Sequence, residues 1–425
     1  MERRKERILL CLCHLSGNEQ KFVQEAFDSN WVVPLGPNVN GFEKDLEEFV
    51  GENKRVVALS AGTAAVHLAL LNCGVGPGDE VLVQSFTFCA SSHPITYLGA
   101  TPVFVDSEKD TWNIDPDLME EAIKDRIAKT GKKPKAIVPV ALYGMPYKID
   151  RIMEIANRYD IPVVEDAAEG FGSKFNGQVL GTFGKYGVLS FNGNKMITTS
   201  GGGALITEDD DHWREIMMYA TQYRESYPYY QHEKIGYNYR MSNICAGIGR
   251  GQMTIANEHI AHHKKVQALY EELLKDVPGI HVHSQPNLPS GRDGGRLYDS
   301  NYWLCTMTLD PDLKVKGQEN AYKQIITGAV GGAAGVIHAA ESAHTDCEPN
   351  ANVEAMRMGL DALNVESRPL WKPMHKQPVY KNAPAYVNGV SEELFKVGMC
   401  LPAGPYVTED DVRFICEAIK SLIED

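Results

Sequence analysis

The sequence predicts an α/β fold, with a mostly parallel sheet in a large first domain and a smaller α/β domain after it. Over the first 250 residues, short β-rich apolar runs alternate with helical stretches, which is the pattern of βαβ units. From about residue 256 the chain changes to a long helical stretch followed by a loop rich in proline and glycine. We therefore expect a large domain over residues 1–255, including an N-terminal arm, and a small domain over residues 256–425.

The individual elements follow from the same two patterns, the short β-rich apolar runs and the helical stretches. In the first part, strands are expected at 55–59, 80–83, 102–106, 136–141 and 162–165, with helices at 63–71, 91–98, 118–129 and 148–159. In the second part, a strand is expected at 302–309 and helices at 253–275, 353–363 and 409–423. Ligands of such sheets bind beyond the carboxyl ends of the strands, so functional residues are expected there.

Composition excludes several classes of protein. The chain has 425 residues, more than one ordinary core holds. Its formal net charge of -14 disfavours a nucleic-acid partner, which needs clustered Lys and Arg. No apolar run approaches the length of a membrane span, so no membrane partner is expected. The nine cysteines form no C-x-x-C pair, which disfavours a zinc site and is typical of reduced thiols in a cytosolic enzyme.

The N-terminus has one feature of a secretory signal. A basic segment precedes an apolar run at residues 8–12, but His14 interrupts that run and no small-residue cleavage site follows. Secretion is therefore not expected, and the chain is assigned to the cytoplasm.

The first candidate binding segment is Ser60-Ala61-Gly62-Thr63, which follows an expected strand and opens a helix. Such a helix start presents free backbone N–H groups and the positive end of the helix dipole, and these suit a phosphate. The alternative is a plain helix cap formed by Ser60 or Thr63.

Two further candidates follow other expected strands. Phe88 lies in an aromatic segment suited to stacking on a planar ring, although such side chains are more often part of a core. Asp166 ends a strand, where a buried carboxylate is costly unless it meets a cation. A protonated pyridine nitrogen is such a cation. The alternative for Asp166 is a helix cap.

The fourth candidate is Lys195, which lies between a strand ending at Ser190 and the triple glycine at residues 201–203. A lysine in a partly dry site can lose its proton and attack a carbonyl, and glycines let the backbone pack close to a bulky ligand. The alternative is a solvated surface lysine. Together, the four segments supply the contacts that pyridoxal 5'-phosphate (PLP) needs when it is held as a Schiff base on Lys195.

These segments closely resemble the DegT/DnrJ/EryC1/StrS family of PLP-dependent sugar aminotransferases, from Asn30 to about Pro378. The resemblance implies the aspartate-aminotransferase fold (fold type I of PLP enzymes) and a homodimer whose active sites lie at the subunit interface. It also implies that Lys195 holds the cofactor, which alternates between PLP and pyridoxamine 5'-phosphate. Members of the family that act as sugar dehydratases carry His at this position, so the lysine argues against that activity.

The resemblance assigns the other cofactor contacts residue by residue. Gly62, Thr63 and Ser190 match the positions that bind the cofactor phosphate. Phe88 matches the aromatic residue that stacks on the ring, and Asp166 matches the carboxylate that pairs with the ring nitrogen.

Further contacts are implied by two later segments and by Glu169. The segment 236–241 (GYNYRM) resembles the one in which an Asn, here Asn238, reaches the cofactor phosphate of the partner subunit. Arg368 and His375 lie in a stretch that often faces the substrate, with interdomain packing as the alternative. Glu169 stands where many members have His or Gln, and we expect it at the substrate.

Glu169 and the run Asn192-Gly193-Asn194 are similar to the bacillosamine-type members. This implies transfer of an amino group from L-glutamate to C4 of a UDP-2-acetamido-4-keto-2,4,6-trideoxyhexose, for surface polysaccharide or glycan biosynthesis. The alternatives are a 3-keto sugar carried by dTDP, or a PLP fold that serves as a sensor without enzymatic activity.

One Gly/Ala-rich segment, residues 318–350, is longer than the usual family spacing. It carries five residues that metals bind: His338, Glu341, His344, Asp346 and Cys347. A dimer contact or a lid loop is the favoured interpretation, and no metal ligands are assigned.

Overall fold

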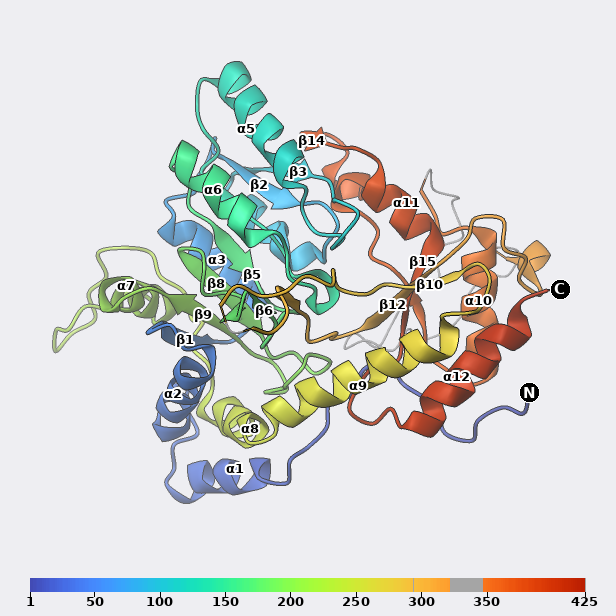
Figure 1. The fold of residues 1–425 in the computed structure, drawn as a ribbon. Coiled ribbons are helices and arrows are strands. Elements are labelled where there is room, and N and C mark those ends of the chain that lie inside the picture. Colours follow the sequence, from blue (N-terminus) through green and yellow to red (C-terminus); the bar gives the residue numbers. More distant parts are fainter. Residues whose placement is uncertain (293, 322–346, 425) are drawn as a thin grey trace.

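The central feature of the computed structural model, which describes residues 1–292, 294–321 and 347–424, is one twisted sheet (Figure 1). Its strands are β1 (Arg55–Leu59), β2 (Glu80–Gln84), β3 (Thr101–Val105), β4 (Ala136–Val138), β5 (Val164–Asp166), β8 (Tyr186–Ser190), β9 (Gly203–Thr207) and β14 (Ala385–Tyr386). They lie in the order β14-β3-β2-β4-β5-β8-β9-β1, and parallel bridges join β4 to β5. Among these strands, β9 alone runs opposite to the others, and it pairs antiparallel with β8 and β1. The expected mostly parallel α/β sheet is therefore confirmed.

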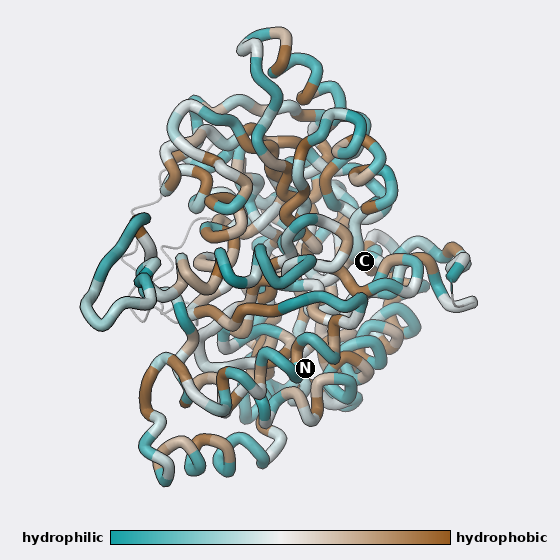
Figure 2. Tube along the Cα trace, turned by 90° about the vertical axis from the view of Figure 1, so that its left-hand side faces the viewer, coloured by the Kyte–Doolittle hydropathy of each residue, from teal (hydrophilic) through white to brown (hydrophobic). Residues whose placement is uncertain are grey.

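Both faces of the sheet are buried because successive strand residues point to opposite sides. In β1, Val56 and Ala58 join one core cluster, whereas Val57 and Leu59 join another. The first cluster includes apolar residues of α2 (Pro37–Val50), α5 (Pro116–Thr130) and α6 (Ile149–Tyr159). The second includes residues of α3 (Gly62–Asn72), α4 (His93–Tyr97) and α7 (Asp210–Ala220). Hydrophobic residues accordingly gather inside the molecule (Figure 2).

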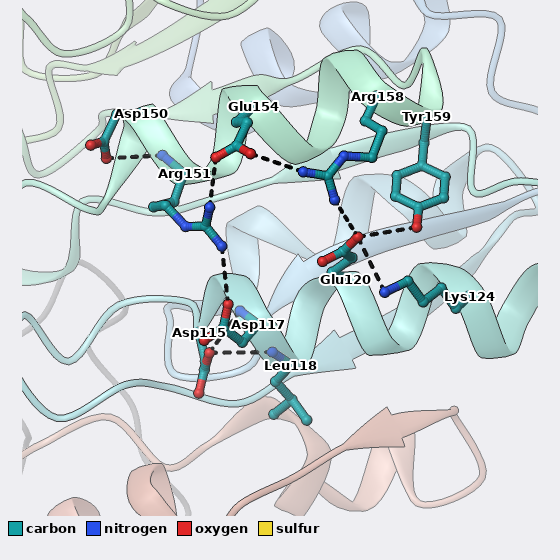
Figure 3. Close-up of polar contacts among 10 residues, drawn as sticks. All are labelled: Asp115, Asp117, Leu118, Glu120, Lys124, Asp150, Arg151, Glu154, Arg158 and Tyr159. Carbon is teal, nitrogen blue, oxygen red and sulfur yellow. Dashed lines mark hydrogen bonds and ion pairs between the residues drawn. The ribbon is translucent and has the colours of Figure 1, made fainter.

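Helices α5 and α6 carry a network of ion pairs on their outer surface (Figure 3). Arg158 bridges Glu120 and Glu154, and Arg151 also reaches Glu154, at distances of 2.6 to 2.8 Å. Exposed pairs of this kind contribute little to stability, because water screens the charges and ordering the side chains costs entropy. Truncating a buried isoleucine such as Ile152 to alanine costs about 2–5 kcal/mol. The apolar side of α6 therefore determines its packing, and the ion pairs add little.

The C-terminal part has its own core. An antiparallel sheet in the order β10-β12-β15-β13 packs against three helices. These elements are β10 (Ile280–Val282), β12 (Cys305–Leu309), β13 (Arg368–Pro369), β15 (Gly398–Leu401), α9 (Ala256–Leu274), α10 (Ala351–Ala362) and α12 (Glu409–Leu422). Two segments cross the expected division at residue 255: Ile8 pairs with Val365 in this core, and β14 pairs with β3 of the large sheet. The boundary itself stays a prediction.

Two expected helices differ in their bounds. The helix expected at 253–275 is α9, which begins three residues later, and helix α8 (Asn243–Met253), which was not expected, ends just before it. Between the two helices, the Thr254 hydroxyl donates to the Gly251 carbonyl. The helix expected at 91–98 divides into η1 (Cys89–Ser91) and α4. Pro94 lies in the first turn of α4, where a residue without an N–H is tolerated.

Helix α1 (Glu19–Asp28) completes the N-terminal part. The remaining short elements are η2 (Leu142–Gly144), β6 (Lys174–Phe175), β7 (Gln178–Val179), β11 (Tyr298–Asp299), η3 (Gln318–Asn320), η4 (Met374–Lys376), η5 (Pro378–Tyr380) and α11 (Val390–Val397). Within the described ranges, no helix is long and apolar enough to cross a membrane.

The candidate metal residues of the 318–350 segment lie outside the described residues, except Cys347, which is buried. Among the residues that the structure does describe, no group of His, Cys, Asp or Glu side chains has the arrangement of a metal site.

Candidate active site

A cavity of about 310 Å³ lies where β5, β8 and the start of α3 meet. Seven of the residues expected in the site line it, namely Gly62, Thr63, Phe88, Asp166, Glu169, Ser190 and Lys195. The structure therefore brings together residues that are up to 133 positions apart in the sequence, since Gly62 and Lys195 line the same cavity. Asn238, Arg368 and His375 are not among the lining residues.

The start of α3 forms one end of the cavity. Ala61, the residue before the helix, is extended and no side chain caps the helix, so the alternative of a cap by Ser60 or Thr63 is not what the structure shows. The first N–H groups of a helix have no partner within it and carry the positive end of its dipole. Together with the hydroxyls of Thr63 and Ser190, they make an anion site that fits a phosphate.

Two glycines let three chain segments meet at this end. A Cβ at Gly62 would lie 3.0 Å from the Cβ of Ser190. A Cβ at Gly203, the partner of Ser190 in the sheet, would lie 2.4 Å from the backbone of Ala61. The shape of this end of the cavity thus depends on the absence of side chains at Gly62 and Gly203.

Asp166 ends β5 and is 4% exposed. One carboxylate oxygen accepts from the Ser91 hydroxyl at 2.7 Å, and the other accepts from the Ala168 N–H at 3.2 Å. Burial raises the pKa of this carboxyl, while these two bonds and the charge of Lys195 oppose the rise. No helix follows, so a cap is excluded. Because both hydrogen-bond donors are neutral, the carboxylate fits a cationic group in the cavity, as a protonated ring nitrogen is.

Lys195 is not a solvated surface lysine. Its side chain is 13% exposed, and its Nζ lies 3.3 Å from Glu169 Oε1. The Nζ also lies 3.9 Å from the centroid of the Trp303 ring. That ring is fixed by its own N–H, which donates to the Asn194 carbonyl at 2.7 Å. The lysine is therefore held between a carboxylate and an aromatic face.

Glu169 is 4% exposed and lies against Lys195, although the resemblance placed it at the substrate. Its Oε2 accepts from the Tyr143 N–H at 2.7 Å. Tyr143 has a left-handed backbone (φ 53°), which is uncommon for a residue other than glycine. Burial raises the pKa of the Glu169 carboxyl, and the charge of Lys195 opposes the rise.

Aromatic side chains line the mouth of the cavity. Phe88 is 49% exposed, and its ring lies 5.4 Å from that of Trp371. A half-exposed phenyl ring in a cavity wall suits stacking on a planar ligand. Trp303 and Ser91 were not singled out from the sequence, because only the tertiary fold brings them to Lys195 and Asp166.

The other three candidates lie elsewhere. Asn238 is exposed and lines a separate hollow of about 440 Å³. Arg368 pairs with Glu366 at 2.7 Å. His375 bonds to the Ser85 hydroxyl at 2.7 Å and to Glu392 at 3.1 Å, so it joins the residue after β2 to α11. For His375, these contacts favour the packing alternative, whereas the pair of Arg368 with Glu366 lies within one segment.

Comparison with known proteins places this cavity in a family. The model of the DegT/DnrJ/EryC1/StrS aminotransferase family matches residues 14–321 and 322–420. The Bacillus subtilis protein EpsN, whose name describes it as a pyridoxal phosphate-dependent aminotransferase, is 40% identical over 98% of this chain and 96% of its own length. The GDP-perosamine synthase of Caulobacter vibrioides is 33% identical over 98% of each chain.

Solved structures agree with the sequence matches. A DegT DnrJ EryC1 StrS aminotransferase from Brucella abortus is 27% identical and superposes with a TM-score of 0.80 over 96% of each chain. This confirms the expected fold type I architecture, and the cavity contains groups that suit each part of PLP. The chain therefore belongs to the DegT/DnrJ/EryC1/StrS aminotransferase family and is a PLP-dependent aminotransferase.

Proposed function

We propose that this enzyme acts in the cytoplasm, where it transfers an amino group from L-glutamate to C4 of a UDP-2-acetamido-4-keto-2,4,6-trideoxyhexose. The observation that carries the proposal is the single cavity shared by Lys195, Asp166 and the open start of α3. The names of two relatives, GDP-perosamine synthase and UDP-2-acetamido-2-deoxy-3-oxo-D-glucuronate aminotransferase, support a nucleotide-linked sugar as substrate. The choice of UDP and of C4 rests on the resemblance at Glu169 and at residues 192–194.

In this proposal each cavity residue has one task. Gly62, Thr63 and Ser190 hold the cofactor phosphate, and Phe88 packs on the ring. Asp166 keeps the ring nitrogen protonated. When bound, PLP supplies an electron sink that stabilises negative charge on the substrate carbon.

Lys195 moves the proton. Its Nζ takes a proton from the substrate carbon that bears the amino group, and it later returns one as a general acid. The low exposure of Lys195 and Asp166 keeps bulk water away from this step.

We further propose that the functional unit is a homodimer in which Asn238 reaches the cofactor phosphate of the partner subunit. Asn238 is exposed and lies outside the cavity of its own chain. Leu35 lines the same hollow as Asn238 and belongs to a run of exposed apolar side chains with Trp31, Val32 and Val33. A contiguous exposed apolar surface marks an interaction site, and a second copy is the occupant that also explains Asn238.

A panel of substrates tests the reaction. The enzyme is incubated with L-glutamate and with UDP-, GDP- and dTDP-linked 3-keto and 4-keto sugars, and products are identified by mass spectrometry and NMR. Amination of the UDP-linked 4-keto sugar is the expected result. Amination of only a dTDP-linked 3-keto sugar would overturn the substrate. If glutamate keeps its amino group although the cofactor is bound, the result would instead favour a sensor without enzymatic activity.

A further inference from the structure

Glu169 is the side chain in the cavity that makes an ion pair with Lys195. The Nζ–Oε1 distance is 3.3 Å, and both side chains are largely buried. Its second carboxylate oxygen accepts from the Tyr143 N–H at 2.7 Å, and its backbone carbonyl accepts from the side-chain amide of Asn301 at 2.9 Å. Glu169 is therefore held at its backbone and at one carboxylate oxygen, and the other oxygen faces the lysine.

We propose that Glu169 is the proton partner of Lys195: it accepts a proton from the lysine ammonium and returns it, so that the lysine can act as a base. In the forward step an Nζ–H bond breaks and an Oε1–H bond forms, while the electron pair of the broken bond stays on Nζ. An ion pair becomes a neutral pair, so the total charge of the two groups does not change. No further reactant is needed.

The surroundings of the pair favour such an exchange. Burial makes the charged carboxylate costly, and it raises the pKa of Glu169 toward that of an acid able to hold a proton. The Trp303 ring opposes this, because it stabilises the ammonium form of Lys195. Burial therefore favours the neutral form of the pair, and the direct Nζ–Oε1 contact gives the proton a path between the two groups.

Four other titratable groups face the pair. They are Asp166 at the end of β5, Tyr143 in η2, Cys400 in β15 and Cys11 in the N-terminal segment. Burial raises the pKa of Cys11 to about 12 and raises the pKa values of Tyr143 and Cys400 as well, so these three stay protonated at neutral pH. Asp166 has both oxygens bonded to Ser91 and Ala168, which leaves Glu169 as the carboxylate in contact with Nζ.

Glu169→Gln is the matched substitution, because the amide keeps an oxygen for the Tyr143 N–H but cannot take up a proton. The inference rests on Lys195 as the cofactor lysine, so that assignment is checked first by borohydride reduction and peptide mapping. If the cofactor is recovered on another lysine, both proposals fail. If it is recovered on Lys195, the remaining measurements test Glu169 alone.

The first measurement does not depend on turnover. In enzyme loaded with pyridoxamine 5'-phosphate, Lys195 is a free amine, and its labelling by 1-fluoro-2,4-dinitrobenzene is followed from pH 6 to 10. Removing the neighbouring negative charge should lower the labelling midpoint by about one pH unit or more. An unchanged midpoint in Glu169→Gln would overturn the proposal.

The second measurement is kinetic. Glu169→Gln should lower kcat about 100-fold with little change in KM for glutamate, and it should increase the isotope effect with 2-deuterated glutamate. Glu169→Asp should recover part of the rate. Glu354→Gln, which alters a buried ion-paired carboxylate in α10, serves as the control and should keep wild-type kinetics. A kcat for Glu169→Gln within twofold of wild type would contradict the role.

Discussion

At the scale of single residues, the site is defined by what surrounds each charge. Asp166 is a carboxylate whose hydrogen-bond donors are both neutral, and Lys195 is an amine between Glu169 and Trp303. Neither residue type is unusual in a protein of this size. Charged side chains are seldom buried without a partner, and Lys195 has Glu169 as its partner. Glu165 is also buried among neutral donors only, but it does not line the cavity. What distinguishes Asp166 and Lys195 is therefore that both line the same cavity.

The charge of Asp166 can be tested by a substitution of the same shape. Asp166→Asn should keep the bond from Ser91 but lose the negative charge opposite the ring nitrogen. We expect a fall in kcat of about 100-fold or more, because a fixed charge in a dry site acts strongly on charge that develops there. Steady-state kinetics with glutamate measure it. Asp361→Asn, on the exposed side of α10, is the control, and an equal loss in both variants would indicate a general defect.

Much of the cavity could be foreseen from the sequence, because Gly62, Asp166 and Lys195 all follow strand ends. Sheet topology then brings such positions to one edge. The neighbours of these residues could not be foreseen. Trp303 reaches Lys195 from the segment just before β12, and the carboxylate of Glu169, which contacts Lys195, also accepts from the Tyr143 N–H. These contacts depend on tertiary packing, which no local pattern encodes.

At the scale of elements, the start of α3 depends on two glycines, and Gly203→Ala tests this most sharply. The added Cβ would lie 2.4 Å from the Ala61 backbone, so β9 and the helix start must move apart. Overpacking of this kind typically costs about 1–3 kcal/mol. Because the strain falls on the backbone that should hold the phosphate, we expect a loss of the same size in binding, which is a roughly 5- to 150-fold fall in cofactor affinity.

Equilibrium dialysis against PLP measures that affinity. Gly76→Ala is the matched control, since its Cβ would meet no atom within 4 Å. If Gly203→Ala bound the cofactor as tightly as Gly76→Ala, the backbone cradle would not be what holds the phosphate.

Helices and strands were predictable where a short stretch of sequence is enough to specify them. The strands that became β1, β2 and β3 were expected within one or two residues, because each is a short apolar run between turns. Strand β14 was not expected, since two residues form a strand only where β3 offers them an edge. Helix α9 was expected within three residues, whereas helix α8 before it was not expected.

At the scale of the whole molecule, a buried histidine links stability to pH. His263 in α9 is fully buried, and burial lowers its pKa to about 3. The unfolded chain, with an ordinary His pKa near 6.5, then binds more protons than the folded one at acidic pH. The stabilising contribution is complete above about pH 6.5 and falls as the pH drops toward 3, amounting to a loss of about 2 kcal/mol at pH 5.

Urea unfolding at pH 8 and pH 5 measures this loss. His263→Gln should be less sensitive to the change of pH than wild type. The exposed His232→Gln should retain the full sensitivity. A wild-type pH dependence in His263→Gln would show that other groups account for the acid sensitivity.

The proposed dimer makes its own prediction at this scale. Lys195→Ala and Asn238→Ala should each be nearly inactive alone. When the two are mixed and exchange subunits, half of the dimers carry one intact site, so about a quarter of wild-type activity should return. Activity that stays at the level of the separate variants after confirmed exchange would contradict a shared site.

The central claim is that Lys195 holds the cofactor. It is tested most directly by reducing the holoenzyme with borohydride, digesting it and locating the cofactor mass by tandem mass spectrometry. The account predicts the added mass on the peptide that contains Lys195, and no such peptide from Lys195→Ala. Recovery of the mass on any other lysine would contradict it.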